Sequence, residues 1–344
     1  MVCAALRAAL EKAVQAASAA RRRPALCLVA LCALALAAQL LDVGAWLRRP
    51  ALTAAAANPF ADVRLHVASD SRAAQAAAAA TGAERAAAER LATTPTAIWL
   101  TPERYPVREV DAYVTWQLEE AAAAGALATF VVYGIPWRDA GGASASSTRP
   151  DEYLAWVGQI ARAIRRHGTL CALVVEPDAL ALSAADERLA ASRPVLASAV
   201  AELASSGAAV YVDAGHCDWV AAEKMAELLK EVGVEGVRGF SLNVSSYYPD
   251  AETCAYGERL AALTGARYVV DTSRNGAGFG QDPRGTWENP RGTRVGRSPS
   301  GAGERDGQLD AWLWVKPPGE SDGPANGGPA AGEWWDEKAL ELAR

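Results

Sequence analysis

Five short apolar runs of the chain each stop at a polar residue, and this repetition constrains the fold more than any other feature. The runs cover residues 173–178, 209–213, 239–243, 267–271 and 311–316. Runs of this length that are rich in β-branched and aromatic residues are typical of buried strands. A single acid at a strand end often does no more than cap the next helix. Because the pattern recurs five times, we expect the polar side chains to share one rim.

Helical patterns separate these runs, so that strands and helices alternate along most of the chain. Strands are predicted over 97–100, 129–133, 170–175, 210–213, 240–243, 268–271 and 312–316, and helices over 107–124, 151–167, 194–206, 220–231, 252–264 and 334–343. An additional Ala-rich helix is predicted over 73–92. Such alternation indicates an α/β protein with a parallel sheet, and about seven strands favour a closed or nearly closed, TIM-like barrel. Chemistry in such barrels lies at the carboxyl ends of the strands.

The N-terminal residues predict a segment that is separate from the barrel. Residues 1–23 form a basic leader, and residues 24–41 carry no charge. This run is close to the minimum for a transmembrane signal anchor, and a cleaved signal peptide is the alternative. We predict an anchor or signal peptide over 24–47, a linker over 48–57 and one folded domain over 58–344. That domain would be extracellular or lumenal, bound to the membrane if the segment is retained and secreted if it is cleaved.

The composition narrows the class of ligand. The 344-residue chain has a net charge of −6 with scattered Lys and Arg, which argues against a nucleic-acid partner. Only three His and no closely spaced Cys pair argue against a metal site, and nothing indicates a cofactor. Eleven Trp against four Phe offer flat faces for stacking on sugar rings, although core packing is the commoner role of Trp. A neutral or polar ligand is therefore expected.

Four aspartates lie at or just beyond predicted strand ends: Asp139, Asp178, Asp213 and Asp322. Carboxylates that converge on one rim suit acid and base work on a glycosidic bond, which needs one protonated and one ionised group. Carboxylates that lie close together favour one protonated and one ionised group, because each disfavours the ionisation of its neighbour. Each aspartate alone could equally cap a helix or pair with an arginine, so the hypothesis depends on the four together.

Six motifs, in order along the chain, resemble glycoside hydrolase family 6, the family of inverting cellulases. They are Tyr133-x-x-Pro-x-Arg138-Asp139, Glu176-Pro177-Asp178, Tyr211-Val-Asp213-Ala-Gly-His216-x-x-Trp219, Asn243-Val-Ser, Asp271-Thr-Ser-Arg274-Asn-Gly276 and Trp314-Val-Lys316-x-x-Gly-Glu320-x-Asp322-Gly323. The similarity runs from residue 58 to residue 335. The resemblance implies a distorted, incompletely closed β/α barrel that hydrolyses β-1,4-glucan with inversion.

The resemblance also implies roles for the residues of the reacting centre. Asp178 would be the general acid, and Asp139 would keep the pKa of that acid high. Asp322 is the usual candidate for the base, although the base of this family is contested and water could relay the proton with Ser144. Inversion requires about 6.5 to 9.5 Å between the acid and base carboxyls. Tyr133 would press on the distorted sugar at the cleavage point.

Other matching positions would bind the glucan or support the site. Trp99, Trp219 and Trp287 match sugar-stacking positions; His216, Asn243, Lys316 and Glu320 match ligand-binding positions; Arg138, Asp213 and Arg274 are supporting residues. Core packing for Trp99 and a solvated strand end for Lys316 are the alternatives. Glu176 is expected to point into the barrel as a structural hydrogen-bonding group.

The sequence departs from the family pattern in ways that bear on function. Ala140 and Glu288 stand where family members commonly have cysteines, so the two usual disulfides are absent. Gly134 and Trp137 replace acidic residues that are often found beside Asp139. Only eight residues separate positions 323 and 332, where tunnel-forming members carry a longer loop. A short loop favours an open cleft and attack within the glucan chain.

These features lead to three hypotheses. The first is an endo-acting β-1,4-glucanase that works as a monomer. The second is a catalytically weak or inactive glucan-binding protein associated with cellulose synthesis, which the missing disulfides and Gly134 motivate. The third is recruitment of a partner through the Ala-rich helix over 73–92.

Overall fold

Nine strands form one sheet in the computed structural model of the protein, which describes residues 51–138, 148–303 and 307–344, all within the unit Pro50–Arg344. The strands are β1 (Arg64–Leu65), β2 (Ile98–Leu100), β3 (Ala126–Val132), β4 (Cys171–Val175), β5 (Ala209–Asp213), β6 (Gly239–Leu242), β7 (Arg267–Asp271), β8 (Ser300–Gly301) and β9 (Leu309–Leu313). Their order is β1-β3-β4-β5-β6-β7-β9-β8, and β2 also pairs with β3. Only the β8–β9 pairing is antiparallel.

The sheet curls into a nearly closed barrel, as predicted. Both β1 and β2 pair with β3, β1 at its start and β2 at its end. The gap between β2 and the end of β9 is joined by two hydrogen bonds. The Ala97 N–H donates to the Trp314 carbonyl at 2.8 Å. The Trp99 indole N–H donates to the Val315 carbonyl, also at 2.8 Å. Trp99 is therefore part of the barrel wall as well as a candidate sugar platform.

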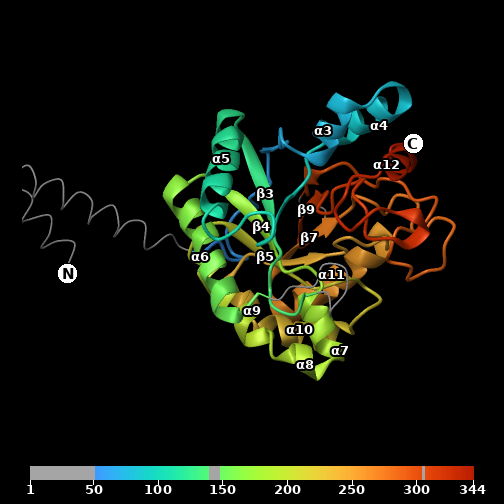
Figure 1. Ribbon diagram of the computed structural model, residues 1–344. Coiled ribbons are helices and arrows are strands. Elements are labelled where there is room, and N and C mark those ends of the chain that lie inside the picture. The colour runs from blue at the N-terminus through green and yellow to red at the C-terminus, as the bar shows by residue number, and fades with distance from the viewer. Residues whose placement is uncertain (1–50, 139–147, 304–306) are drawn as a thin grey trace, which may run out of the picture. The chain divides into compact units, whose positions relative to one another are not determined.

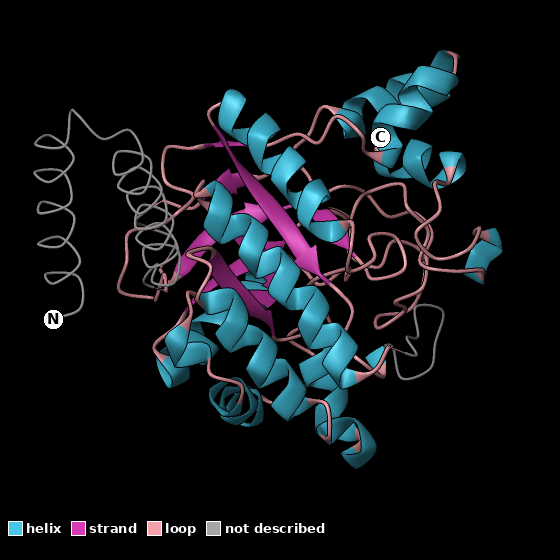
Figure 2. Ribbon diagram, turned by 60° about the vertical axis from the view of Figure 1, so that its left-hand side comes forward, coloured by secondary structure: helices cyan, strands magenta, loops and turns pink. Residues whose placement is uncertain are grey.

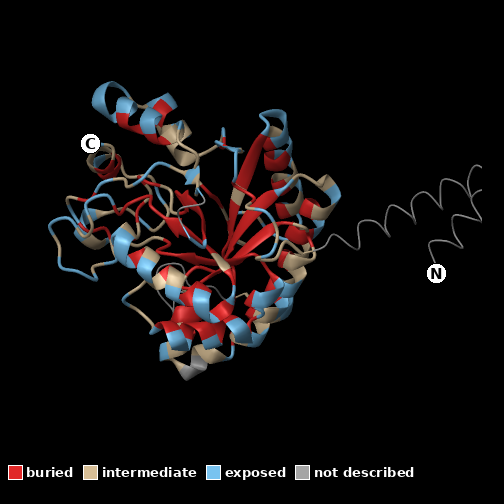
Figure 3. Ribbon diagram, turned by 180° about the vertical axis from the view of Figure 1, so that it is seen from behind, coloured by how far each residue is buried: buried red, intermediate tan, exposed pale blue. Residues whose placement is uncertain are grey.

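Helices follow most strands and cover the outside of the barrel (Figures 1 and 2). They are α3 (Arg72–Ala79), α4 (Gly82–Ala92), α5 (Val110–Ala123), α6 (Pro150–His167), α7 (Ala179–Ala185), α8 (Glu187–Ala190), α9 (Arg193–Ala204), α10 (Ala222–Glu231), α11 (Asp250–Thr264) and α12 (Asp336–Leu342). Figure 3 shows buried strands surrounded by helices whose outer faces are exposed. The six helices predicted between and after the strands are all present, with ends shifted by three residues or fewer.

Burial on both faces explains why the strand sequences read as continuous apolar runs. All five residues of β4 are buried. Cys171, Leu173 and Val175 belong to the cluster that packs against the surrounding helices. Ala172 and Val174 belong to a second cluster, which also holds Tyr211 and Leu313 of other strands. The side chains of each strand therefore alternate between two apolar environments rather than between core and water.

Three predicted elements differ from the structure: one helix, the strand predicted over 129–133, which begins at Ala126, and the last strand. The helix predicted over 73–92 is wrong as one element, because α3 ends at Ala79 and α4 begins at Gly82, whose φ is +57°. Figure 1 shows α3 and α4 close to α12, and Leu91 of α4 shares a cluster with Ala339 of α12. The last strand was predicted three residues too late. The strand begins at Leu309. The prediction missed this start because the charged residue Asp310, which is buried, interrupts the apolar pattern there.

The segment predicted over 24–47 lies outside the described residues. None of the helices in the described part of the chain is both long enough and apolar enough to cross a membrane.

Candidate active site

The tip of β4 has a strained backbone on both sides of Pro177. Glu176 has φ = +51° and Asp178 has φ = +71°, in the left-handed region that costs a non-glycine residue about 1 to 3 kcal/mol. The residue before a proline is disfavoured even in the right-handed helical region. Asp178 is only half-buried, whereas Glu176 is fully buried. The turn therefore brings one acid to the rim and directs the other inward.

Asp213, at the end of β5, holds this turn in place. One of its carboxylate oxygens accepts the Asp178 N–H at 2.9 Å and the Gly215 N–H at 3.0 Å. The other accepts the Ser241 hydroxyl at 2.9 Å. Burial raises the pKa of Asp213, although these hydrogen bonds oppose the shift. Asp213 is thus a positioning residue for the Asp178 backbone.

Glu176 acts on the neighbouring loop in the same way. Its carboxylate accepts the Gly134 N–H at 2.9 Å, the Ile135 N–H at 3.1 Å and the Tyr153 hydroxyl at 2.9 Å. Burial raises the pKa of Glu176 to about 7 against these hydrogen bonds. The bonds hold the segment that follows β3, which leads from Tyr133 towards residue 139.

Tyr133 and Trp99 form one aromatic corner beside that segment. Their rings meet edge to face with centroids 5.2 Å apart. The Arg138 guanidinium lies 4.9 Å from the Tyr133 ring centroid and donates to the Tyr133 carbonyl at 3.2 Å and to Glu103 at 2.9 Å. These contacts leave Tyr133 about 8% exposed, so its ring is fixed in place. Asp139 and Ser144, predicted for the reacting centre, lie outside the described residues.

Asp322 lies in a dense set of hydrogen bonds on the loop after β9. Both of its carboxylate oxygens accept from buried Arg274, at 2.9 and 2.7 Å. Its second oxygen also accepts the Asn289 N–H at 3.1 Å and the Tyr247 hydroxyl at 3.3 Å. Lys316 lies 3.4 Å away. Burial alone would raise the pKa of Asp322, but the charges of Arg274 and Lys316 hold it below its ordinary value. Asp322 is therefore an ionised carboxylate.

Lys316 and Glu320 come from the same loop and are positioned through its backbone. Buried Asp271, at the end of β7, accepts the N–H groups of Val315 at 3.1 Å and Lys316 at 3.0 Å. These N–H groups bond to a carboxylate instead of a neighbouring strand, and β9 ends at Leu313. Burial raises the pKa of Glu320, although Lys316 opposes this shift.

His216, Trp219 and Tyr248 form an aromatic wall after β5 and β6. The His216 ring stacks on Tyr248 with centroids 4.4 Å apart and lies 5.1 Å from the Trp219 ring. Burial lowers the pKa of His216 to about 4, so the imidazole is neutral at physiological pH and can hydrogen-bond to hydroxyl groups. The Arg284 guanidinium, from the long loop after β7, lies over the Tyr248 ring, 4.7 Å from its centroid. Trp287 of that loop is 62% exposed.

Asn243 is placed differently from the ligand-binding residue that was predicted. It is fully buried with φ = +64°. Its amide N–H groups donate to the carbonyls of Tyr248 at 3.2 Å and Asp271 at 3.1 Å, and its amide oxygen accepts the Tyr248 N–H at 3.2 Å. The whole amide is used to shape the loop after β6. Residues 243–245, Asn-Val-Ser, also match an N-glycosylation sequon, and the burial of Asn243 argues against its modification.

The arrangement places a half-buried acid, an ionised carboxylate and aromatic faces at the carboxyl ends of parallel strands. No cluster of three or more metal-ligating side chains exists among residues 51–138, 148–303 and 307–344. Acid and base catalysis on a polar, ring-shaped substrate is the chemistry that these groups can perform.

Comparison with known proteins identifies the family. The model of the family described as "Glycosyl hydrolases family 6" matches residues 59–344. The chain belongs to glycosyl hydrolase family 6.

The relatives of this family 6 chain include bacterial enzymes. It is 41% identical over 271 residues to Endoglucanase A of Cellulomonas fimi, an alignment that covers 77% of this chain and 58% of the relative. It is 35% identical to Endoglucanase 1 of Streptomyces halstedii, covering 79% of this chain and 86% of the relative. The chain spans less than two thirds of the length of the Cellulomonas fimi protein.

Solved structures of the family share the fold. The endoglucanase Cel6 of Mycobacterium tuberculosis, in complex with methyl-cellobiosyl-4-deoxy-4-thio-β-D-cellobioside, superposes with a TM-score of 0.76 at 39% identity, covering 83% of this chain and 98% of that one. The catalytic core of the cellobiohydrolase Cel6A of Chaetomium thermophilum gives a TM-score of 0.72 at 26% identity, with 83% and 98% coverage.

Some residues of the family 6 site have no signal in the sequence. Asn289 exchanges hydrogen bonds with the Asp322 backbone and side chain, and its amide donates to the Gly323 carbonyl at 2.7 Å. Glu288 accepts the Ala325 N–H at 3.0 Å and so joins the two loops at a position where cysteine was expected. Both contacts span more than 30 residues, and neither an asparagine nor a glutamate in a long loop indicates such a partner.

Proposed function

We propose that this family 6 chain hydrolyses β-1,4-glucosidic bonds of cellulose or related β-glucans with inversion, by attack within the chain. The single observation that carries the proposal is the turn at β4, where two left-handed residues direct Asp178 to the rim while Asp213 binds its backbone. Such strain at a half-buried acid is characteristic of functional sites. The names of the relatives and the ligand of the Mycobacterium tuberculosis structure support the substrate class.

In this mechanism Asp178 donates its proton to the leaving oxygen as the glycosidic bond breaks. Asp139 supports the protonated state of Asp178, since a neighbouring carboxylate disfavours its ionisation. Tyr133 packs against the distorted sugar. Of the proposed acid and base, Asp178 and Asp322, Asp322 is the ionised one. Because Arg274 lowers its pKa, Asp322 is a weak base in the ground state. It accepts a proton, directly or through water and Ser144, only when the attacking water becomes acidic beside the oxocarbenium-like carbon.

Substrate-binding roles follow from the same positions. Trp99 and the Trp219 wall offer sugar-stacking faces, with Trp287 as a third. Lys316, Glu320 and neutral His216 offer hydrogen bonds to hydroxyl groups. The short segment between positions 323 and 332 and the endoglucanase names of the relatives at 35 to 41% identity support attack within the chain. A site outside the cytosol remains our proposal from the uncharged run of residues 24–41.

The test is hydrolysis of a soluble cellulose derivative, with the anomer released from cello-oligosaccharides followed by NMR. We expect α-anomer product from the wild type and a loss of about 100-fold or more in rate for Asp178→Asn. The matched control is Asp62→Asn, which removes a carboxylate from an exposed turn and should leave the rate unchanged. An inactive wild type would support the second hypothesis, a glucan-binding protein without turnover. A β-anomer product would refute inversion.

A further inference from the structure

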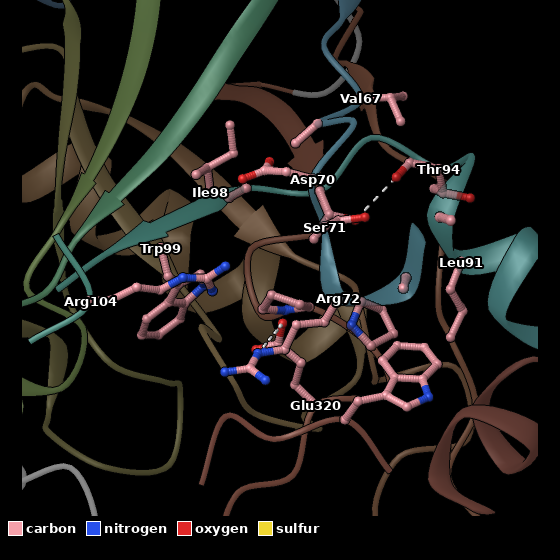
Figure 4. A pocket seen from close by; sticks show the side chains of 18 of the residues that line it. Val67, Asp70, Ser71, Arg72, Leu91, Thr94, Ile98, Trp99, Arg104 and Glu320 are labelled. Atoms are coloured by element: carbon pink, nitrogen blue, oxygen red, sulfur yellow. Dashed lines mark hydrogen bonds and ion pairs between the residues drawn. The ribbon is translucent and has the colours of Figure 1, made fainter. Parts of the chain in front are cut away.

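A cavity of the described residues lies beyond Trp99, away from the carboxylates. It is an open recess between the start of α3, β2, the turn before α5 and the loop after β9, with about 670 Å³ of space that includes the solvent at its mouth. Trp99 and Glu320 line it, whereas Asp178 and Asp322 do not. Figure 4 shows the labelled side chains of Asp70, Arg72 and Arg104 around the same space as Trp99 and Glu320. The cavity therefore continues from two proposed glucan-binding residues, away from the reacting centre.

The lining combines an aromatic face with hydrogen-bonding groups of both charges. Tyr105 and Tyr113 are stacked with ring centroids 3.9 Å apart, and the Arg104 guanidinium lies 5.3 Å from the Tyr105 ring centroid. Asp70 accepts the Tyr113 hydroxyl at 2.9 Å and faces the cavity. A lining that combines aromatic side chains with donors and acceptors is suited to a sugar, which has apolar C–H groups and an equatorial ring of hydroxyls.

Charge in this cavity is balanced, which favours a neutral ligand. Arg72 and Arg104 supply two positive charges, and Asp70 and Glu320 supply up to two negative ones. Arg72 lies 3.9 Å from Glu320, too far for a good hydrogen bond. An anionic ligand would have to approach both carboxylates. Hydroxyl groups can instead accept from the arginines and donate to the carboxylates at the same time.

One buried donor of the cavity lacks a hydrogen-bond partner, and a second cation has no ion pair within the described part of the chain. The Arg72 Nε is buried and makes no hydrogen bond. Arg104 is exposed, and no carboxylate of the described residues lies within ion-pair distance of its guanidinium. A buried donor without a partner is costly, and a ligand oxygen that satisfies it contributes binding free energy. The packing of the protein alone therefore leaves the Arg72 donor unsatisfied.

We propose that this cavity is an additional sugar-binding subsite, which takes one neutral glucosyl unit of the substrate chain beyond the unit on Trp99. Arg72 and Arg104 donate to the hydroxyl groups of that unit, and the carboxylates of Asp70 and Glu320 accept from them. This inference rests on the proposed function, because it assumes a β-1,4-glucan at Trp99.

The experiment compares kcat/KM for cello-oligosaccharides of increasing length in the full chain. In the wild type we expect one length step, the one that first fills the cavity, to raise kcat/KM about tenfold, the equivalent of one charge-assisted hydrogen bond. In Arg72→Ala/Arg104→Ala this step should fall to twofold or less, and kcat/KM should fall more for the substrates that fill the cavity than for shorter ones. Arg162→Ala, an exposed charge on α6, is the matched control and should retain the whole step.

The outcomes separate this inference from the proposed function. If the double variant keeps the full length step, the subsite is refuted although hydrolysis stands. If the wild type hydrolyses none of the oligosaccharides, the proposed function fails, and calorimetric binding of cellohexaose and cellotetraose to both proteins tests the subsite alone. A loss of preference for the longer ligand in the double variant would then support it, and equal preference would refute it. The single variant Arg104→Ala, which changes an exposed side chain, gives the same test if the double variant does not fold.

Discussion

Replacing Glu176 by glutamine should change the stability of the protein in a way that reverses with pH. Burial raises the pKa of Glu176 to about 7 in the folded protein, against about 4.3 for an exposed glutamate. As pH rises between these values, the unfolded chain releases its proton while the folded protein keeps it, so stability is lost. Each unit of pKa corresponds to about 1.4 kcal/mol, which gives a loss of roughly 3 to 4 kcal/mol that is complete just above pH 7.

The glutamine variant has no proton to release at this position, so the difference between the two proteins isolates Glu176. The amide oxygen can still accept the N–H groups of Gly134 and Ile135, both at 3.1 Å. The amide nitrogen takes the place of the oxygen that accepts the shorter bond from Gly134 and the Tyr153 hydroxyl, so it must donate to that hydroxyl. One reversed hydrogen bond costs about 1 kcal/mol. We therefore expect the wild type to be more stable by about 1 kcal/mol near pH 4.5. We expect Glu176→Gln to be more stable by about 2 kcal/mol at pH 8.

The assay is urea unfolding followed by tryptophan fluorescence at pH 4.5, 6 and 8. Other buried acids such as Asp213 titrate in both proteins and cancel in the difference. Glu119→Gln, an exposed change on α5, should show no pH-dependent difference from the wild type. A gap that is constant, or that grows in favour of the wild type as pH rises, would refute the reasoning and show that the hydrogen bonds keep Glu176 ionised. At a pH where the wild type and Glu176→Gln are both folded, the rate of Glu176→Gln on soluble glucan should be reduced far less than the rate of Asp178→Asn.

Three further changes test the packing of charge and backbone. Arg274→Met should destabilise the protein by about 3 to 5 kcal/mol, because it leaves Asp322 buried without its partner; adding Asp322→Asn should restore part of the urea midpoint, and no restoration would contradict this. The Arg238 guanidinium binds carbonyl groups within residues 53–56 and also pairs with Asp310. Arg238→Met should therefore release this segment, and protease cleavage there should become faster. Gly239→Ala should lower the unfolding midpoint strongly, since its Cβ would lie 1.7 Å from a backbone oxygen of β7; an unchanged midpoint would mean that the strands can separate.

The barrel could be predicted from the sequence because each strand is buried on both faces. Such strands read as short apolar runs, and the helices between them have their own period. The prediction failed where a charge is buried inside a strand. Asp310 of β9 is 1% exposed because Arg238 binds both of its carboxylate oxygens, at 2.7 and 2.8 Å, from more than 70 residues away. Local sequence cannot reveal that compensation.

The rim of the site was predictable only where its residues follow strand ends directly. Asp178, Asp213 and Lys316 come at the ends of apolar runs, and the structure places them after β4, at the end of β5 and after β9 of one barrel. Arg72 and Arg104 belong to a helix start and a turn, which showed no pattern beyond ordinary surface charge. Their common cavity depends on how α3 and the turn before α5 lie against β2, a tertiary arrangement that sequence spacing does not encode.

The acids at the strand ends are of two kinds, and this division explains how the site is built. Glu176, Asp213 and Asp271 are buried, and each accepts backbone N–H groups from loops of neighbouring strands. Asp178 and Asp322 lie on the loops that are held in this way. In sequence all five look alike, as an acid after an apolar run or in a loop. Since the buried acids bind N–H groups, a change in their protonation should alter the loops that carry the reacting acids. Stability and activity of this protein should therefore depend on pH together, with the buried carboxylates as the common cause.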